Sequence, residues 1–513
     1  MKEHINDYLI KYSKSDNYPW HMPGHKRQNV FETDEMWQEI FSRDFTEAKD
    51  LDDMHEPETF IRDAMQTFKE IYGTYSTYML VNGSTGGILS ALYACAPEKS
   101  VVLVARNCHK SVYNAICLLK LRPEYIMPEM IPDTSSAIFG DIKPQQVEEK
   151  IIALRKKGIK PSTAVITSPT YEGVISDVAE ILAVLKKYDI PLIVDEAHGA
   201  HLPFMGEDYP VSAINAGADI VVQSTHKTLP ALTQTALLHV NNEKLDENIK
   251  KYLKIFQTSS PSYIFMQSIE KAVFFSYTHK EEYLKYRQIL ESFRAKCLKL
   301  KNICLLDTEN KCYAYDICKL VFMINSYEKQ NEKEAVQNTE ADTGKQKNQY
   351  MKQYTGTWLA ERLAAYHKIT EMAGTNYVIA MTSVADKEEA YDALFDALEK
   401  IDEEIETITD TTNDIPKIKT IEPSDITIPE MAIIPGEAWN LPTERTELKK
   451  AVNCISGTTV YAYPPGIPLL VPGEKISEST IRAITKMSKS DLNLSGVYVD
   501  DGMLYIDVVI CKI

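Results

Sequence analysis

The sequence lacks the features of a secreted, disulfide-linked or membrane-spanning protein. Its nine cysteines are scattered along 513 residues and form no CxxC pair, so neither zinc ligation nor a disulfide framework is expected. No apolar run approaches the roughly 18 residues of a membrane helix. The first residues, Met1 to Lys14, contain no apolar core of a secretion signal. These absences predict a cytoplasmic protein with reduced thiols and no membrane partner.

The sequence also lacks the G-x-x-x-x-G-K-[ST] loop with which nucleoside triphosphatases hold phosphates. This absence matters because Asp195-Glu-Ala-His198 follows an apolar run and matches the letter pattern of DEAH-box helicases. The nearest Gly-Lys pair, Gly344-Lys345, lies downstream in a polar stretch. A net charge of −17 also disfavours a nucleic-acid partner and is compatible with a small cationic substrate. The helicase interpretation is therefore rejected.

The length of the chain predicts several domains, because 513 residues exceed what one hydrophobic core supports. The composition is that of an ordinary globular protein, with 44% hydrophobic and 25% charged residues. Four segments are expected: an N-terminal arm (1–60), a large domain (61–300), a small α/β domain (301–412) and a C-terminal module (413–513). The small domain contains a polar insertion, residues 325–354, that cannot bury enough surface to fold alone.

Strand and helix patterns alternate between about residues 70 and 240, which predicts a largely parallel sheet with helices on both faces. The last connection in this region, Ser224 to Thr235, contains Pro230 and is barely long enough for a crossover. One antiparallel strand is therefore expected, which makes the sheet mixed. The predicted strands are Tyr78 to Val81, Val101 to Ala105, Thr163 to Thr167, Ile190 to Val194, Asp219 to Gln223 and Ala236 to Val240; the predicted helices are Ile88 to Ala94, Ser111 to Leu119 and Val178 to Tyr188. Beyond it, strands are predicted at Tyr377 to Thr382, Val497 to Val499 and Met503 to Val509, with a helix from Lys387 to about Glu404.

Lys227 lies where lysines are rare, between two apolar runs. Burial disfavours its charged form, and a neutral amine is the nucleophile that forms imines with aldehydes. A lysine in a loop usually reaches solvent, so the position alone is not decisive. Asp195 ends another apolar run, and ligands of open α/β sheets bind just beyond such strand ends. The pair suits pyridoxal phosphate, with Lys227 as the Schiff-base lysine and Asp195 as the partner of the pyridinium nitrogen.

A possible phosphate site lies in Val81-Asn-Gly-Ser84-Thr85-Gly86-Gly87, between a predicted strand and a predicted helix. Glycines and hydroxyl residues at a helix start offer free N–H groups and the positive end of the helix dipole to an anion. A capped helix after a tight turn would have the same sequence. Ser84, Thr85 and Gly86 are predicted phosphate ligands only because Lys227 and Asp195 call for a phosphorylated cofactor.

Two further strand ends carry polar residues toward the same edge of the sheet. His109, in Asn107 to Ser111, could lie flat on a pyridine ring, although a solvent-exposed histidine at a helix start is the ordinary alternative. Ser168 to Gly173 would line the same crevice. This convergence is better evidence for a site than any single motif. The spacing of His198 and His201, with no further ligand set beside them, does not predict a metal site.

With these residues the chain resembles the Orn/Lys/Arg decarboxylase family of fold-type-I pyridoxal phosphate enzymes, most closely the short bacterial arginine and lysine decarboxylases without an N-terminal wing domain. The resemblance covers most of the chain, and the first and fourth of its further motifs are specific to the family. These motifs are His21-Met-Pro-Gly-His-Lys26, Leu51-Asp-Asp-Met-His55, Thr258-Ser-Ser-Pro-Ser-Tyr263, Tyr463-Pro-Pro-Gly-Ile-Pro468 and Val471-Pro-Gly-Glu474. Residues 325–354 and 495–513 match no motif of the family.

The resemblance implies roles for individual residues. Lys227 would hold the cofactor covalently, Asp195 would pair with the pyridine nitrogen, His109 would stack on the ring and His198 would lie near the phenolic oxygen. The phosphate would be bound by Ser84, Thr85, Ser224 and His226. The resemblance also implies a homodimer or larger homo-oligomer in which the arm and the Thr258 to Tyr263 segment reach a neighbour's cofactor.

The substrate implied by the resemblance is a basic amino acid, with arginine first, giving agmatine for polyamine biosynthesis, and lysine or ornithine as alternatives. A carboxylate should bind the distal cation. The sequence does not rank the candidates, which are Asp44, Asp52, Asp53, Glu437 and Glu474. Two other classes remain: the α-oxoamine synthases, which share the fold but lack the two specific motifs, and a non-catalytic regulator that keeps the fold.

Overall fold

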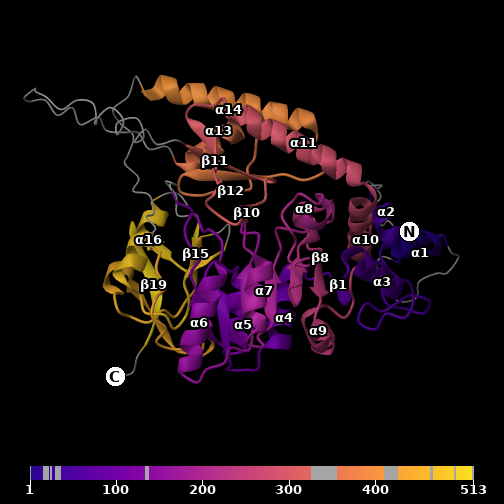
Figure 1. Ribbon diagram of the computed structural model, residues 1–513, viewed down its shortest axis with the longest axis horizontal. Coiled ribbons are helices and arrows are strands. Elements are labelled where there is room, and N and C mark those ends of the chain that lie inside the picture. The colour runs from indigo at the N-terminus through magenta and orange to yellow at the C-terminus, as the bar shows by residue number, and fades with distance from the viewer. Residues whose placement is uncertain are drawn as a thin grey trace, which may run out of the picture.

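The computed structural model describes residues 2–14, 22–23, 26–28, 36–132, 138–324, 355–409, 426–462, 466–489 and 493–510. Figure 1 shows a large α/β body that holds the central sheet, a smaller α/β layer above it and a β-rich module beside it. The N-terminal helices lie at the opposite side of the large body from the β-rich module. Among the described helices, none is both long enough and apolar enough to cross a bilayer.

The central sheet has seven strands in the order β1-β8-β7-β6-β4-β2-β3. Strand β8 runs antiparallel to both of its neighbours, whereas the other neighbouring strands pair in parallel. The mixed, mostly parallel sheet predicted from the sequence is therefore confirmed, including its single reversed strand. The strands are β1 (Ser76–Leu80), β2 (Val101–Ala105), β3 (Arg122–Ile126), β4 (Ala164–Thr167), β6 (Leu192–Asp195), β7 (Ile220–Gln223) and β8 (Ala236–Val240).

Strand β3 was not predicted, because its sequence, Arg-Pro-Glu-Tyr-Ile, contains proline and two charged residues. It lies at the edge of the sheet and pairs only with β2 among the described strands. An edge strand tolerates proline because one of its sides donates no ladder hydrogen bonds. Proline and charged residues usually argue against a strand, but they are typical of a strand at the edge of a sheet.

Helix α4 (Gly83–Cys95) begins five residues before its predicted start at Ile88 and contacts β1, β6, β7 and β8. Its close approach depends on Gly87, where a Cβ would lie 2.6 Å from Leu80 Cδ1 and 2.9 Å from Val222 Cγ1. A side chain at this position would push the helix away from the sheet. The other helices of the large body are α5 (Lys110–Leu118), α6 (Pro144–Lys156), α7 (Val178–Lys186), α8 (Thr225–Thr228), α9 (Glu243–Phe256) and α10 (Tyr263–Thr278); helix α11 (Lys280–Cys297) follows α10 and packs on the smaller layer.

The N-terminal segment forms α1 (His4–Ser13), α2 (Met36–Arg43) and α3 (Phe60–Tyr72). Helix α1 packs on α3 and α10, and its Ile5 and Leu9 side chains are fully buried in the main hydrophobic core. The N–H groups of Ile5 and Asn6 donate to the Glu270 carboxylate at 3.1 and 2.9 Å. The segment has no core of its own and depends on the large body for burial.

The smaller layer is a four-stranded sheet in the order β12-β13-β11-β9. Helices α13 (Gly356–Ala365) and α14 (Glu388–Thr409) lie with α11 at the outer side of this layer (Figure 1). Its strands are β9 (Ile303–Leu305), β11 (Lys319–Ile324), β12 (Met372–Ala373) and β13 (Tyr377–Met381). The layer is joined to the large body by a short pair, β10 (Ala314–Tyr315) with β5 (Val174–Ile175). The polar insertion at 325–354 lies outside the described residues.

The C-terminal module contains two three-stranded sheets, in the orders β14-β19-β18 and β16-β15-β17. It has a small hydrophobic core of its own, which includes Leu448, Val460, Ile484 and Ile506. The elements are α15 (Pro435–Ala438), β14 (Thr443–Glu447), β15 (Val460–Ala462), β16 (Pro468–Leu470), α16 (Glu478–Ser488), β17 (Leu494–Ser495), β18 (Tyr498–Asp500) and β19 (Met503–Val509). Strands β18 and β19 agree with the two predicted at this end of the chain.

Candidate active site

The carboxyl ends of β2, β4, β6 and β7 meet at one edge of the central sheet, and the predicted catalytic residues lie there. Asp195 is the last residue of β6 and is paired with Thr167 of β4 and Val222 of β7. Lys227 belongs to the short helix α8, which follows β7 after Ser224. Parallel neighbouring strands place their ends side by side, so Asp195 and Lys227 face the same region.

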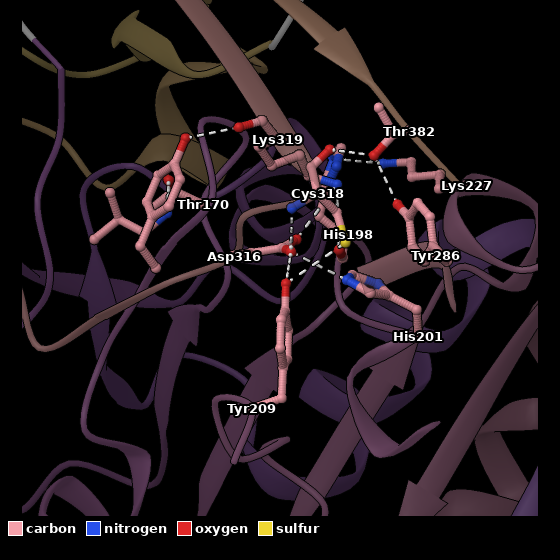
Figure 2. Close-up of polar contacts among 12 residues, drawn as sticks. Thr170, His198, His201, Tyr209, Lys227, Tyr286, Asp316, Cys318, Lys319 and Thr382 are labelled. Atoms are coloured by element: carbon pink, nitrogen blue, oxygen red, sulfur yellow. Dashed lines mark hydrogen bonds and ion pairs between the residues drawn. The ribbon is translucent and has the colours of Figure 1, made fainter. Parts of the chain in front are cut away.

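The Lys227 side chain contacts a histidine and is surrounded by charged groups. Its Nζ lies 2.9 Å from His198 Nε2 (Figure 2). Burial lowers the pKa of Lys227; the Asp195 carboxylate opposes that shift, and the Lys319 ammonium adds to it. The lowered pKa favours the neutral amine, which is the nucleophilic form.

The Asp195 carboxylate is almost fully buried. Burial raises the pKa of Asp195, while the nearby Lys227 charge and the N–H of Ala197, which donates to Oδ1 at 3.2 Å, pull it back down. A positively charged group placed beside this carboxylate would hold it in its ionised form. A protonated pyridine nitrogen is such a group.

His109 and His226 both have one ring nitrogen engaged by neighbours. His109 caps helix α5, with Nδ1 accepting the N–H of Ser111 at 3.2 Å. Burial, together with Lys227, lowers the pKa of His109 to about 4, so the ring is neutral near pH 7. His226 Nδ1 donates to the Thr235 carbonyl at 2.7 Å, and burial lowers the pKa of His226 as well.

The predicted phosphate segment forms the first turn of α4, where Ser84 is half-buried, Thr85 is exposed and Gly86 is buried. Gln234 connects this turn to α8, because its Nε2 donates to the Val81 carbonyl at 2.7 Å and the adjacent Thr235 carbonyl accepts the His226 hydrogen bond. The start of α4 and the start of α8 therefore lie on either side of the 234–235 segment.

The site has the donors and acceptors that a polar cofactor requires. Among the buried side chains that the structure describes, Ser224 Oγ, Asn107 Oδ1 and His198 Nδ1 have no hydrogen-bond partner. Buried polar atoms are normally satisfied, and these three follow β7, β2 and β6 at one edge of the sheet. Together with Lys227 and Asp195 they fit pyridoxal phosphate, which needs an amine, a carboxylate and several polar contacts.

Three residues outside the predicted set, Lys319, Asp316 and Glu371, also surround this region, and Tyr171, which belongs to the predicted Ser168 to Gly173 segment, contacts the last of them. Lys319 and Asp316, from the smaller layer, contact the loop that follows Asp195, as Figure 2 shows. Tyr171 donates to Glu371, and the Glu371 carboxylate acts on the pKa of Lys227. Lys319 is the first residue of an apolar run in the sequence, Lys-Leu-Val-Phe-Met-Ile. This run is the one sequence feature from which a buried position for Lys319 could have been suspected.

Two of the candidate carboxylates for the substrate's distal cation are already engaged within the chain. Asp52 accepts the N–H groups of Glu58, Thr59 and Ile61 at 2.8 to 3.0 Å. Glu474 forms a buried ion pair with Arg106 at 3.0 Å. These two carboxylates have structural partners, which weakens their case as substrate ligands. Asp53 Oδ1 accepts the N–H of His55, and Glu437 is exposed.

His201, Asp316 and Cys318 bring three possible metal-ligand atoms within 4.8 Å of one another, all of them buried. Hydrogen bonds already account for this cluster, because Asp316 Oδ1 accepts from His201 Nε2 at 3.2 Å, from the Tyr209 hydroxyl at 2.7 Å and from the Cys318 N–H at 3.0 Å. Burial raises the pKa of the Cys318 thiol well above its ordinary value, which disfavours the thiolate that a metal would bind. The absence of a metal stays a prediction.

The sheet, the reversed strand and the lysine at its edge define a fold-type-I pyridoxal phosphate enzyme. Comparison with known families agrees: residues 5–341 match the major domain of the Orn/Lys/Arg decarboxylases, and residues 424–498 match their C-terminal domain. The chain belongs to this family. It is a pyridoxal phosphate-dependent amino acid decarboxylase, and the resemblance stated from its motifs is confirmed.

Individual relatives carry different substrates in their names. The chain is 29% identical to an uncharacterized protein, YaaO, of Bacillus subtilis (95% of each chain) and 28% identical to the arginine decarboxylase of the same organism (95% and 94%). The lysine decarboxylase LdcF of Francisella novicida has the same fold, with a TM-score of 0.81 at 19% identity over 99% of this chain and 81% of that one.

Proposed function

We propose that this enzyme decarboxylates arginine to agmatine with pyridoxal phosphate held by Lys227. The observation that carries the proposal is the Lys227 amine, lowered in pKa, 2.9 Å from His198 and at the same sheet edge as the buried Asp195. An amine of this kind is suited to covalent attachment of an aldehyde. Lysine and ornithine are the alternative substrates within the same family.

When bound, pyridoxal phosphate accepts the electron pair that remains on the substrate's Cα after carbon dioxide leaves. In this proposal the Asp195 carboxylate keeps a proton on the pyridine nitrogen. The neutral His109 ring would stack on the bound cofactor, and His198 would lie near its phenolic oxygen. Lys227 would hold the cofactor covalently and could return a proton to Cα. Phosphate ligands are proposed to be Ser84, Thr85, Gly86, Ser224 and His226.

The substrate's distal cation requires a carboxylate at some distance from Lys227. We add Glu371 to the candidates, because its charge acts on Lys227 and it is exposed while held by Tyr171. A guanidinium could bind such a carboxylate through two parallel hydrogen bonds, which a lysine ammonium cannot form. The arginine decarboxylases among the relatives support arginine, and the lysine decarboxylases keep lysine as the second choice.

The deciding experiment supplies the purified enzyme, saturated with pyridoxal phosphate, with arginine, lysine and ornithine separately. We expect release of carbon dioxide and formation of agmatine from arginine, with kcat/KM at least tenfold above that for the other two. Lys227→Ala is the matched control, since it removes the amine and leaves the sheet unchanged. If the principal product is cadaverine or putrescine, the substrate is lysine or ornithine instead of arginine. If none of the three amino acids yields an amine, the proposed function is contradicted.

Four further expectations from the sequence remain proposals. They are a role in polyamine biosynthesis, a cytoplasmic location, the domain boundaries at 60, 300 and 412, and a homo-oligomer with active sites shared between subunits. The last is supported by the N-terminal segment, whose helices have no separate core and whose His55 contacts the Thr258 carbonyl at 2.8 Å. These are the two segments that the family resemblance assigns to a neighbour's cofactor.

A further inference from the structure

Lys319 is a lysine with no solvent exposure, at the first position of β11 in the smaller layer. Its Nζ lies 3.5 Å from the His198 carbonyl oxygen and 3.8 Å from Asp316 Oδ2 (Figure 2). Lysines are almost never fully buried unless they are paired. The two contacts are long, so the ammonium is enclosed by the protein without being tightly neutralised.

Asp316 is the partner of Lys319 and also holds the loop that carries His198. It accepts hydrogen bonds from the Tyr209 hydroxyl at 2.7 Å and from His201 Nε2 at 3.2 Å. Burial would raise the pKa of Asp316, but His201 and Lys319 hold it below its ordinary value. Residues 316–319 therefore contact the 195–201 loop at two points, the His198 carbonyl and the His201 ring.

The backbone of the large body is shaped to admit Lys319. Gly173 has a φ of +103°, and a Cβ there would lie 2.8 Å from Lys319 Cγ and 3.0 Å from its Cβ. The Gly173 carbonyl accepts the Asp316 N–H at 2.8 Å. Any other residue at position 173 would be strained and would displace the lysine. A pair of hydrophobic residues would fill this space with less desolvation, so stability alone does not explain a charge here.

We propose that Lys319 is a positioning residue: its buried ammonium lies against the backbone of His198, whose ring contacts the Lys227 amine, so that its charge disfavours a second positive charge on Lys227, and with Asp316 it fixes the loop that carries His198. The inference rests on the proposed role of Lys227. It adds a residue from the smaller layer that need not touch substrate or cofactor, and it explains why a lysine lies against the active-site loop. Burial lowers the pKa of His198 well below its ordinary value, and the Lys319 charge adds to this, so the ring that contacts Lys227 is neutral.

Several charged groups face Lys227, and their effects have opposite signs. Asp195 on β6 and Glu371 before β12 raise its pKa, whereas Lys319 on β11 lowers it. His198 touches the amine, and a proton on Lys227 would lower the pKa of His109 and His226. Lys319 itself faces Asp316, Cys318 and the His198 carbonyl. Among the described groups that act on Lys227, Lys319 is the one cation from the smaller layer.

The test measures the pKa of the Lys227 amine in cofactor-free enzyme, from the pH dependence of its acetylation by dilute acetic anhydride, with the labelled peptide quantified by mass spectrometry. Lys319→Met keeps the length of the side chain and removes its charge. We expect the pKa of Lys227 to rise by about one unit, which slows labelling up to about tenfold at any pH where most of the amine carries a proton. Lys143, whose Nζ lies 3.0 Å from each Asp141 carboxylate oxygen, is the internal reference and should not change.

Two variants separate charge from packing. Lys319→Arg keeps the charge and should restore the pKa of Lys227 to within a few tenths of a unit of the wild-type value. Tyr209→Phe removes a hydrogen bond to Asp316 without changing any charge, and it should lower the melting temperature but leave that pKa in place. Equal shifts in Lys319→Met and Tyr209→Phe, or no shift in Lys319→Met, would overturn the proposal.

If Lys319→Met does not fold, the double variant with Asp316→Asn removes the ion pair as a neutral unit, which buried sites often tolerate. The pKa of Lys227 should still rise, because Lys319 and not Asp316 is among the groups that act on it, though by less than in Lys319→Met; an unchanged value would also overturn the proposal. Borohydride reduction of the cofactor-loaded wild-type enzyme followed by peptide mapping is run in parallel. Cofactor attached elsewhere than Lys227 would contradict the proposed function, whereas attachment at Lys227 without the shift would contradict only this inference.

Discussion

Replacing Glu474 with leucine should detach the C-terminal module from the large body. The Arg106 guanidinium, directly after β2, donates to Glu474 Oε2 at 3.0 Å and to the Leu469 carbonyl at 3.1 Å. It also lies 4.5 Å from the centroid of the Tyr125 ring. The two charged side chains are only 3% and 0% exposed. A cation left in this place without its carboxylate has neither water nor an anion to stabilise it.

The expected loss follows from that burial. Removing one partner of a buried ion pair lowers the free energy of unfolding by roughly 3–5 kcal/mol. The Val471 N–H, which donates to Glu474 Oε2 at 2.8 Å, also loses its acceptor, at a cost of about 1 kcal/mol or more. Replacing both Arg106 and Glu474 by leucine leaves no charge behind, so the double variant should be close to wild type in stability.

The opposite single variant, Arg106→Met, should be sensitive to pH. Burial raises the pKa of Glu474, and Arg106 counteracts this rise; without Arg106 the pKa rises further. For an acid whose folded-state pKa lies above the unfolded value of about 4.3, the stabilisation is fully present below that value and is lost as the pH rises through the folded-state pKa. Arg106→Met should therefore be less destabilised at pH 5 than at pH 8, whereas Glu474→Leu should show no such relief.

Chemical denaturation at the two pH values, with limited proteolysis to identify the released module, measures these effects. The double-mutant cycle should give a coupling free energy of about 3 kcal/mol or more between Arg106 and Glu474. Additive losses in the double variant, or a loss below about 1 kcal/mol for Glu474→Leu, would refute the view that this ion pair holds the module. Because Arg106 precedes His109 by three residues, Glu474→Leu should also weaken cofactor binding, measured by fluorescence titration.

Four other outcomes are expected. Lys227→Ala should lose the borohydride-reducible imine to the cofactor and nearly all turnover, and a retained reducible imine would reject the assignment. Asp195→Asn should fold and bind cofactor but lose roughly 100-fold or more in kcat, because about 1.4 kcal/mol corresponds to each tenfold; a change of only a few-fold would reject its electronic role. Glu371→Gln should raise KM for arginine about 10- to 100-fold, as expected for one lost charge-assisted hydrogen bond, with cofactor affinity unchanged as the control. Mixing inactive Lys227→Ala with inactive Asp53→Ala should recover up to about a quarter of wild-type activity if sites are shared between subunits, and no recovery despite proven subunit exchange would reject shared sites.

The strands of the central sheet could be predicted because their signal is local. A strand buried on both faces is an uninterrupted apolar run, as in Val-Val-Leu-Val-Ala for β2 and Ala-Leu-Leu-His-Val for β8. The length of the connection between β7 and β8 also predicted the reversal of β8. Strand β3 has no such run, since it lies at an edge where proline and charge are tolerated. Strand β3 can be recognised only from its pairing with β2, and that pairing is visible only in the folded structure.

The placement of Asp195 and Lys227 at one edge of the sheet could be predicted for the same reason, whereas several of the residues around them could not be predicted. Asp195 and Lys227 each follow a recognisable strand, and strand ends meet at one edge in any parallel sheet. Lys319 and Asp316 reach this edge from a separate sheet, 121 and 115 positions along the chain from the residues that they contact. A lysine at a strand start normally points to water. Its burial results from the packing of two sheets, which no local pattern records.

For the candidate carboxylates too, the sequence shows which residues carry a negative charge but not which partners they bind in the fold. Asp52 and Glu474 were considered as ligands for the substrate's cation because of their charge and their motifs. In the fold, the Asp52 carboxylate accepts three backbone N–H groups before and in the first turn of α3, and Glu474 neutralises Arg106 from 368 positions away. Each would have to give up these contacts to bind a guanidinium, with a loss comparable to what the substrate could return. Glu371 is held by one tyrosine and remains exposed, so it can bind a cation at a smaller cost.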